Sequence, residues 1–228
     1  MKALCTLIAM VFAVTVHSGD LAEKLNAPES SDFEDGSVQG WSWAAGYGDV
    51  YNPGYLSDNC LRSRDRSSPP FSHLIAPDRY HGDWSRWVTY AVDGDICPGY
   101  VEYDYRVLND GWVTETRDVY PSFWIAMDFD DLDQRIVARY SPVDPVQEDG
   151  GPNDGWHHLR APFHPIAPGD PLPGDVNGQW IMIAGTDDDW NDLLRSVEYV
   201  YFIIDIAQSP YRSEQFLIDN FRLVSKQI

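Results

Sequence analysis

The chain has 228 residues and a mass of 25.9 kDa, a length that fits one domain built around a single core. Its hydrophobic content of 43% and aromatic content of 14% exclude intrinsic disorder over most of the sequence. The formal charge of −20 and the pI near 4.3 argue against nucleic acid and anionic membrane surfaces as partners, because net repulsion replaces counterion release. The same charge favours cations as ligands, although solubility outside the cell explains an acidic surface equally well.

The first segment is typical of a signal peptide. Lys2 precedes an apolar run from Ala3 to Val16, and the small residue Ser18 follows, so we expect cleavage after Ser18 and a secreted, extracellular protein. The run has 14 residues, short of the roughly 20 that cross a bilayer as a helix, so no membrane span is expected in the mature chain. A buried core helix is the alternative. Residues 19–31 are expected to form a polar lead-in, and residues 32–228 the folded domain.

Short apolar and aromatic runs recur between Gly- and Pro-rich turns along the rest of the chain, which indicates antiparallel strands. Val101, Tyr103 and Tyr105 alternate with charged residues, so one face of that strand is expected to be buried. The expected strands are residues 87–92, 100–107, 122–127, 135–140, 180–184, 199–206 and 215–224. This pattern predicts an all-β fold of the sandwich type.

One short helix is expected ahead of the last two strands. Thr186 and Asp189 have the spacing of a capping box, and the acidic residues from Asp187 to Asp189 complement the positive end of a helix dipole. Turn-forming residues leave little room for a long helix, so this one is expected to end near Arg195.

The cysteines suggest one disulfide. Cys5 lies in the expected signal peptide, which leaves Cys60 and Cys97 as an even pair in an export pathway that permits disulfides. We therefore predict that Cys60 and Cys97 pair. Two free buried thiols are the alternative, because an even count does not fix the Cα separation that a disulfide requires.

Three segments, taken in chain order, carry a family resemblance. Phe33-Glu34-Asp35-Gly36 with Gly40-Trp41 resembles the opening strand and turn of galactose-binding-like jelly rolls, a group that includes many carbohydrate-binding modules. The run from Phe71 to Trp87, in which Ala76-Pro77 precedes an aromatic residue and a Gly-Asp step, is similar to the laminin B domain, also called laminin IV type A. The last third also resembles that domain: it has Trp180, an acidic helix, a hydrophobic strand and the closing run Ile218-Asp219-Asn220-Phe221-Arg222-Leu223.

The resemblance implies an all-β, two-sheet antiparallel jelly roll whose first and last strands lie side by side. It also implies a structural calcium held by Glu34 and Asp219 with help from backbone carbonyls. Calcium takes six to eight oxygen ligands, and two carboxylates brought together would repel each other without a cation between them. From the residues alone, the two carboxylates could instead cap strand ends or pair with Arg222, without any metal.

Other candidate ligand sites are weaker. The acidic run from Asp128 to Asp133 lacks the alternate spacing and the closing glutamate of a calcium loop, which favours a solvated turn. His157 and His158 are adjacent on an extended segment and should point opposite ways, which argues against zinc at these residues and His164. Aromatic rings that could stack on sugars lie beside acidic residues, although each ring is more often part of a core: Trp84, Trp87, Trp112 and Trp124, with Asp83 and Asp110.

Catalytic motifs are missing from the sequence. It contains no Gly-x-Ser-x-Gly, no His-Glu-x-x-His and no phosphate-binding loop, so no catalytic residue is assigned. The leading hypothesis is a secreted, non-catalytic interaction module, adhesive or carbohydrate-binding, with a structural calcium and a glycan or matrix protein as its partner. The alternative is a secreted hydrolase or lyase that cleaves polysaccharide in an acidic cleft, because abundant Asp and Glu leave carboxylate pairs possible.

Overall fold

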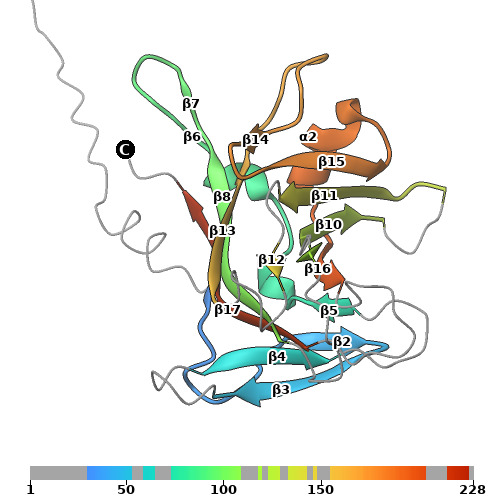
Figure 1. The fold of residues 1–228 in the computed structure, drawn as a ribbon. Helices are drawn as coiled ribbons and strands as arrows, with labels where there is room; N and C mark the ends of the chain where they lie inside the picture. Colours follow the sequence, from blue (N-terminus) through green and yellow to red (C-terminus); the bar gives the residue numbers. More distant parts are fainter. Residues whose placement is uncertain are drawn as a thin grey trace, which may run out of the picture.

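The structure, a computed structural model, describes residues 30–52, 59–64, 73–108, 118–119, 123–128, 133–142, 146–147, 155–203 and 215–225. Two antiparallel sheets pack face to face in it, with one short helix beside them (Figure 1). This arrangement confirms the predicted fold class, an all-β, two-sheet jelly-roll sandwich with one short helix.

The first sheet has six strands and contains both ends of the described chain. Its order is β13-β8-β17-β4-β3, with β1 paired to β17. The bounds are β13 (His157–Phe163), β8 (Gly99–Leu108), β17 (Gln215–Ser225), β4 (Cys60–Arg64), β3 (Tyr47–Tyr51) and β1 (Ser30–Ser31). Ser30 and Ser31 pair with Arg222 and Phe221, so the first and last described strands lie side by side, as the family resemblance implies.

The second sheet has seven strands in the order β14-β15-β11-β10-β16-β5-β2. The bounds are β14 (Gly174–Asp175), β15 (Gly178–Ala184), β11 (Ile136–Pro142), β10 (Phe123–Met127), β16 (Tyr199–Ile203), β5 (His73–Ile75) and β2 (Ser42–Ala44). Two small ribbons complete the fold: β12 (Val146–Gln147) with β9 (Asp118–Val119), and β6 (Thr89–Tyr90) with β7 (Ile96–Cys97).

The core between the sheets joins segments from both ends of the sequence. Val101, Tyr103 and Tyr105 of β8 are buried in it, which confirms the alternation read from the sequence. Trp41, from the opening motif, lies 5.2 Å from the ring of Phe221 in the closing strand, measured between ring centroids, and the two rings meet edge to face. The opening and closing motifs therefore meet in the core.

The folded domain includes Ser31, one residue ahead of its predicted start at Asp32. The sequence places Ser31 in the polar lead-in, whereas the structure buries it completely in β1. Its hydroxyl oxygen lies 2.8 Å from the hydroxyl of Tyr80, accepts the indole N–H of Trp41 at 3.0 Å, and lies 2.6 Å from a guanidinium nitrogen of Arg79. A buried hydroxyl with this many partners belongs to the domain.

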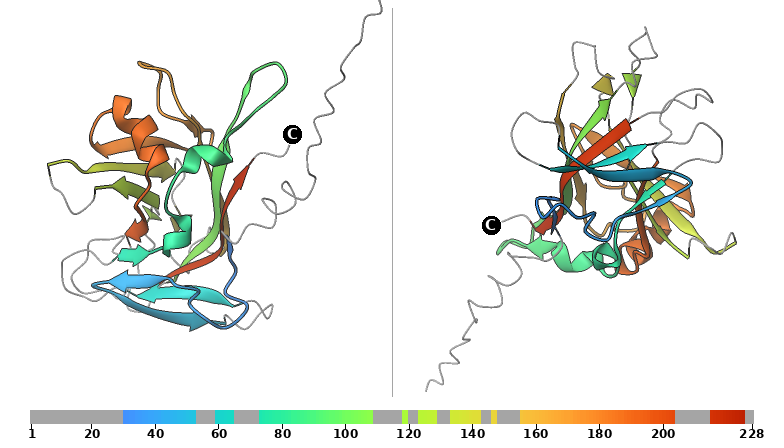
Figure 2. Two further views of the ribbon diagram at one scale, coloured as in Figure 1. Left: turned by 180° about the vertical axis from the view of Figure 1, so that it is seen from behind. Right: turned by 90° about the horizontal axis from the view of Figure 1, so that it is seen from below.

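Residues 84–90 depart from the expected strand over 87–92. A 3-10 helix, η2 (Trp84–Trp87), comes first, and only β6 follows. Asp83 caps η2 because its Oδ1 accepts the Ser85 N–H at 2.9 Å, and Trp84 and Trp87 both turn into the core. Figure 2 shows η2 and the preceding η1 (Asp78–Tyr80) on the side of the sandwich between the two sheets.

The predicted helix is confirmed, with a 3-10 first turn. It consists of η3 (Asp187–Asp189) followed by α2 (Trp190–Arg195). Asp189 Oδ2 accepts both the backbone N–H of Thr186 at 2.7 Å and its hydroxyl at 2.8 Å, which is the capping chemistry expected from the spacing. Among the described residues, none of the helices has the length and apolar character needed to cross a membrane.

The predicted disulfide does not form, and both thiols are free and buried. Ile218 of β17 pairs with Leu61 on one side and with Tyr105 on the other, so Cys60 lies level with Asp104. Cys97 lies seven residues before Asp104, which is roughly 20 Å at about 3.3 Å per residue. A disulfide joins Cα atoms only about 4.4–6.8 Å apart, so the Cys60–Cys97 pair is corrected to two separate thiols.

Thiol counting tests this correction. Unfolding the protein without reductant and alkylating it is expected to modify both Cys60 and Cys97, as detected by peptide mass spectrometry. In the folded protein Cys60 should resist alkylation, because burial raises the pKa of its thiol to about 12. Recovery of a peptide pair linked through these two cysteines would contradict the structure.

Candidate functional site

One row of outward-facing side chains crosses the seven-stranded sheet. Arg139 of β11 pairs with Ile181 of β15 and with Trp124 of β10. Trp124 pairs in turn with Tyr201 of β16, and Tyr201 pairs with Ile75 of β5. We call these five residues the aromatic row. Their strand neighbours point the other way, into the core, so the row lies on the outer face of the sheet.

The rings of the aromatic row stack against one another. The guanidinium carbon of Arg139 lies 5.4 Å from the ring centroid of Trp124. On the other side, the Trp124 and Tyr201 centroids are 5.8 Å apart with an interplanar angle of 25°. The His73 ring meets Tyr201 edge to face at 5.2 Å. Because Arg139 and Tyr201 flank Trp124, the row offers ring edges to a ligand instead of a flat indole platform.

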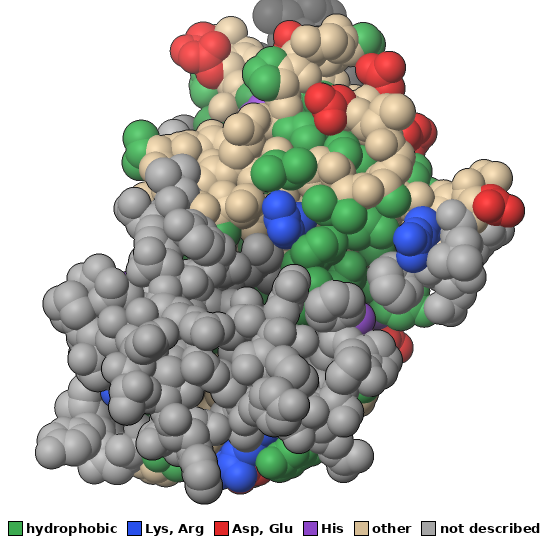
Figure 3. All heavy atoms as spheres, turned by 45° about the vertical axis from the view of Figure 1, so that its right-hand side comes forward, with side chains coloured by type: hydrophobic (Ala, Val, Ile, Leu, Met, Phe, Trp, Pro, Cys, Tyr) green, Lys and Arg blue, Asp and Glu red, His purple; other side chains and the backbone are tan. Residues whose placement is uncertain are grey.

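The surroundings of the row are apolar. Ala126, Val137 and Tyr201 form a hydrophobic cluster that is separate from the main core. Ile181 and Ile183 of β15 are 41% and 46% exposed. Figure 3 shows hydrophobic side chains gathered on this side of the molecule, with Lys and Arg side chains among them. An apolar area on the outer face of a sheet is typical of an interaction surface.

Two polar atoms in the row lack acceptors. Trp124 Nε1 and Arg139 Nε are shielded from water and have no hydrogen-bond partner within the described part of the chain. Leaving a buried donor unsatisfied costs about 1–3 kcal/mol of folding free energy, so these two groups destabilise the protein when no ligand is bound. An oxygen-bearing ligand that reaches them would remove that cost.

Burial sets the charge of the neighbouring titratable groups. It lowers the pKa of His73, which keeps that ring neutral at pH 7. It also raises the pKa of Tyr201, an effect that the positive charge of Arg135 partly offsets. The phenol therefore stays protonated, and the positive charge near the row comes from arginine.

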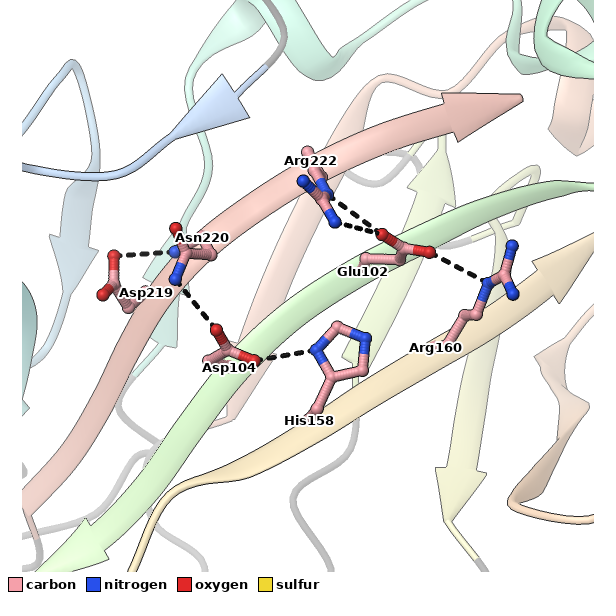
Figure 4. Close-up of polar contacts among 7 residues, drawn as sticks. All are labelled: Glu102, Asp104, His158, Arg160, Asp219, Asn220 and Arg222. Atoms are coloured by element: carbon pink, nitrogen blue, oxygen red, sulfur yellow. Dashed lines mark hydrogen bonds and ion pairs between the residues drawn. The ribbon is translucent and has the colours of Figure 1, made fainter. Parts of the chain in front are cut away.

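The outer face of the six-stranded sheet is polar and internally paired (Figure 4). Glu102 of β8 accepts the Arg222 Nε–H at 2.9 Å, and Arg222 Nη2 lies 2.8 Å from the same carboxylate oxygen. Arg160 of β13 forms an ion pair with the other oxygen of Glu102 at 2.9 Å. These contacts tie three neighbouring strands together, so this part of the face serves the sheet itself.

A second polar contact set lies next to the first. The Nδ1 atom of His158 lies 2.7 Å from Asp104 Oδ1, and the Asn220 side-chain amide donates to Asp104 Oδ2 at 2.8 Å. Adjacent His157 instead stacks on the ring of Tyr105, which confirms that the two histidines point opposite ways. Asp104 is thus engaged on both oxygens.

The structure brings the two expected calcium ligands into one neighbourhood. Asp219 lies at a bulge in β17, where its Oδ1 accepts the Asn220 N–H at 2.7 Å. Glu34 follows β1, and its Oε1 accepts the Asn59 N–H at 2.8 Å. Burial first, and then the negative charges of Asp104 and Glu34, raise the pKa of Asp219 to about 7. Asp219 is therefore a buried acid in a negative environment.

The fit of calcium to this place is partial. A bound cation relieves the repulsion between neighbouring carboxylates, here the buried Asp219 and the exposed Glu34, and carboxylate oxygen is a ligand that calcium prefers. In the described ranges, however, no three His, Cys, Asp or Glu side chains converge on a common point. Glu34 and Asp219 would therefore hold calcium only with backbone carbonyls and water as the remaining ligands.

The other sequence candidates are now placed. Trp84 and Trp87 belong to the core, and Asp83 caps η2. Trp124 lies in the aromatic row, and Trp112 and its neighbour Asp110 lie outside the described residues. Asp128 and Asp133 are exposed, with residues 129–132 outside the described ranges, and His164 bonds the Pro165 carbonyl.

Sequence reasoning missed Arg139 and Tyr201. The available signal is in residues 199–203, where Tyr, Val, Tyr, Phe and Ile place apolar side chains on both faces of one strand. A strand with two apolar faces has a second surface to cover. That pattern, applied to Tyr201 and its neighbours, would have pointed to this face of the sheet.

Comparison with known proteins assigns no family. No protein-family model matches the sequence, and a search of curated proteins finds no match. The chain is therefore not placed in the laminin B family that its motifs resemble.

Solved structures of similar architecture exist. They include the CBM22-1–CBM22-2 tandem domain of Xyn10C from Paenibacillus barcinonensis, at 11% identity and a TM-score of 0.47 over 86% of this chain and 49% of that one. The carbohydrate esterase vb_24B_21 of the Shiga toxin-encoding bacteriophage phi24B matches at 13% identity and a TM-score of 0.47, over 87% of this chain and 98% of that one. The L4b domain of human laminin alpha-2 matches at 9% identity and a TM-score of 0.44, over 82% of this chain and 98% of that one. This chain spans about half the length of the tandem domain, and similarity at this level assigns it no ligand.

Proposed function

We propose that the domain is a non-catalytic carbohydrate-binding module and that the aromatic row is its binding surface. The observation that carries the proposal is the row itself. Arg139, Trp124 and Tyr201 lie side by side on the outer face of a rigid sheet, next to exposed isoleucines. Side chains on paired strands are fixed relative to one another, which lowers the entropy cost of binding.

The chemistry of the row suits a sugar. A pyranose ring has apolar C–H groups and polar hydroxyl groups within a few ångströms of each other, so its binding site needs apolar contact and hydrogen-bonding groups together. Ile181 and the aromatic edges provide the apolar contact. The N–H groups of Trp124 Nε1 and Arg139 Nε have no acceptor within the described residues. Sugar hydroxyl oxygens accept these hydrogen bonds once the two side chains shift to expose their N–H groups.

An array of glycans and matrix proteins, probed with the purified domain, tests this proposal. Saturable binding to one class of glycan is expected, with the glycan left chemically intact. Release of reducing ends or unsaturated products over time would show an enzyme instead. Binding to matrix proteins alone would also overturn the proposal.

The finer assignments are part of the same proposal. The chain is exported after cleavage behind Ser18, as the signal-like first segment suggests. It is a divergent laminin B-type jelly roll, which the meeting of Trp41 and Phe221 in the core supports, since these residues come from its opening and closing motifs. Calcium bound by Glu34 and Asp219 is structural, because Asp219 belongs to the six-stranded sheet and Glu34 to the turn after β1, whereas the aromatic row lies on the other sheet.

Replacing Asp219 by asparagine tests the calcium assignment. In chelator, Asp219→Asn is expected to raise the melting temperature by about 2 °C or more, because it removes the repulsion from Asp104 and Glu34. Millimolar calcium is expected to raise the melting temperature of the wild type and not that of Asp219→Asn. Differential scanning calorimetry measures both effects.

Asp170→Asn is the matched control, because Asp170 is an exposed loop residue away from Glu34 and Asp219. It should leave the calcium response unchanged. A wild type whose melting temperature ignores calcium, or an equal response in wild type and Asp219→Asn, would contradict the calcium assignment.

A further inference from the structure

Two arginines beside the aromatic row have no acidic partner. Within the described part of the chain, neither Arg139 nor Arg135 forms an ion pair. On the six-stranded sheet three arginines are paired, since Arg62 lies 2.6 Å from Asp49, and Arg160 and Arg222 both contact Glu102. Arg64 of the same sheet stacks on Tyr47 and forms no ion pair within the described residues. In a chain with 36 acidic and 16 basic residues, two uncompensated arginines on one face are unexpected.

Both arginines lie close to the rings of the row. Arg139 stacks on Trp124. Arg135 precedes β11, two positions before the outward-facing Val137, and its charge acts on the hydroxyl of Tyr201. The two guanidinium groups therefore place positive charge at Trp124 and at Tyr201.

The ring geometry adds to this positive character. Aromatic rings are negative on their faces and positive at their edges. Because Arg139 and Tyr201 cover the faces of Trp124, a ligand can meet this ring only at its edge, and the Tyr201 ring itself is only 6% exposed. Three described carboxylates lie near the row in the chain: Asp133 precedes Arg135 by two residues, and Asp128 and Glu198 lie beyond the ends of β10 and β16, where Glu198 accepts the Asp128 N–H at 2.8 Å.

We propose that the aromatic row binds an acidic glycan, whose carboxylate or sulfate group pairs with Arg139 and Arg135 while its sugar ring lies on the ring edges and isoleucines. This deepens the proposed function and rests on it. Guanidinium groups match carboxylate and sulfate oxygens with paired N–H donors. The net charge of −20 does not prevent this, because charges beyond about 8 Å are largely screened at physiological ionic strength.

Affinity measurements with the full chain test the inference. The probes are polygalacturonate for carboxylates, a sulfated galactan for sulfates, and xylan as a neutral polysaccharide, titrated by calorimetry at physiological ionic strength. The wild type is expected to bind one of the two acidic polymers at least about tenfold more tightly than xylan. Which polymer binds identifies the anionic group.

Arginine variants locate the interaction. Arg135→Gln is expected to weaken binding of the acidic polymer about tenfold and to leave binding of xylan unchanged. Arg139→Gln is expected to weaken binding of the acidic polymer about tenfold and to weaken binding of xylan less, because Arg139 also meets the sugar hydroxyls. Arg195→Gln is the matched control, because Arg195 lies on α2 and pairs with Asp192 across one helical turn, away from the aromatic row. It should bind like the wild type.

The outcomes separate the two proposals. Binding of xylan as tight as binding of either acidic polymer, or acidic binding that survives both Arg139→Gln and Arg135→Gln, overturns the acidic-glycan inference and leaves a neutral carbohydrate-binding module. Binding of no polysaccharide by the wild type overturns the proposed function and this inference together.

Discussion

Trp124→Ala is expected to lower the affinity for the bound glycan at least about tenfold, because the indole is the centre of the aromatic row. A tenfold loss of affinity corresponds to only about 1.4 kcal/mol of binding free energy. Its loss removes the contact with Arg139 on one side and with Tyr201 on the other. Titration calorimetry with the best glycan from the array measures the change.

Trp156→Ala is the matched control for this experiment. Trp156 is 40% exposed and precedes β13, at the edge of the other sheet, so the same chemical change is made away from the row. Affinity should be retained in Trp156→Ala, and both variants should keep the wild-type circular dichroism spectrum. Equal losses in the two variants would contradict the assignment of the row.

Phe221→Ala is expected to destabilise the fold by about 3–5 kcal/mol, the usual cost of removing a fully buried phenylalanine ring. The ring lies 4.7 Å from the centroid of Tyr80 and 5.2 Å from that of Trp41, so its removal leaves a cavity where the opening and closing motifs meet. The neighbouring bulge, where Asn220 has a φ of 51°, limits how far the strand can collapse into that cavity.

Urea denaturation measures this loss. Tyr90→Ala is the control, because Tyr90 is 60% exposed on the β6–β7 ribbon and its removal should change stability by no more than about 0.5 kcal/mol. A Phe221→Ala variant whose free energy of unfolding lies within about 1 kcal/mol of the wild-type value would show that the opening and closing motifs are not coupled through this ring.

Much of the fold follows from local sequence pattern. The strand from Gly99 to Leu108 alternates buried tyrosines with charged residues, and a pattern of period two is enough to identify it. The strand over residues 157–163 was not predicted, because its two histidines and Pro162 do not resemble a strand. It is an edge strand, where proline is tolerated, and its pairing with β8 stabilises it.

The candidate site was harder to predict, because it depends on strand register. Trp124 was identified as one of several rings, but its neighbours Arg139 and Tyr201 come from strands 15 and 77 residues away in the sequence. Register between distant strands is set by the packed core and not by local composition. The same limit explains the cysteine error, since the count of two could not show that Cys60 and Cys97 lie at different levels of the sheet.

The indole N–H signals of the nine tryptophans, followed by NMR during titration with the best glycan, test the central claim most directly. Trp124→Ala and Trp156→Ala identify two of these signals by their disappearance. The account predicts that the Trp124 signal shifts saturably with the glycan while the Trp156 signal stays in place. Saturable glycan binding that leaves the Trp124 signal unmoved would contradict it.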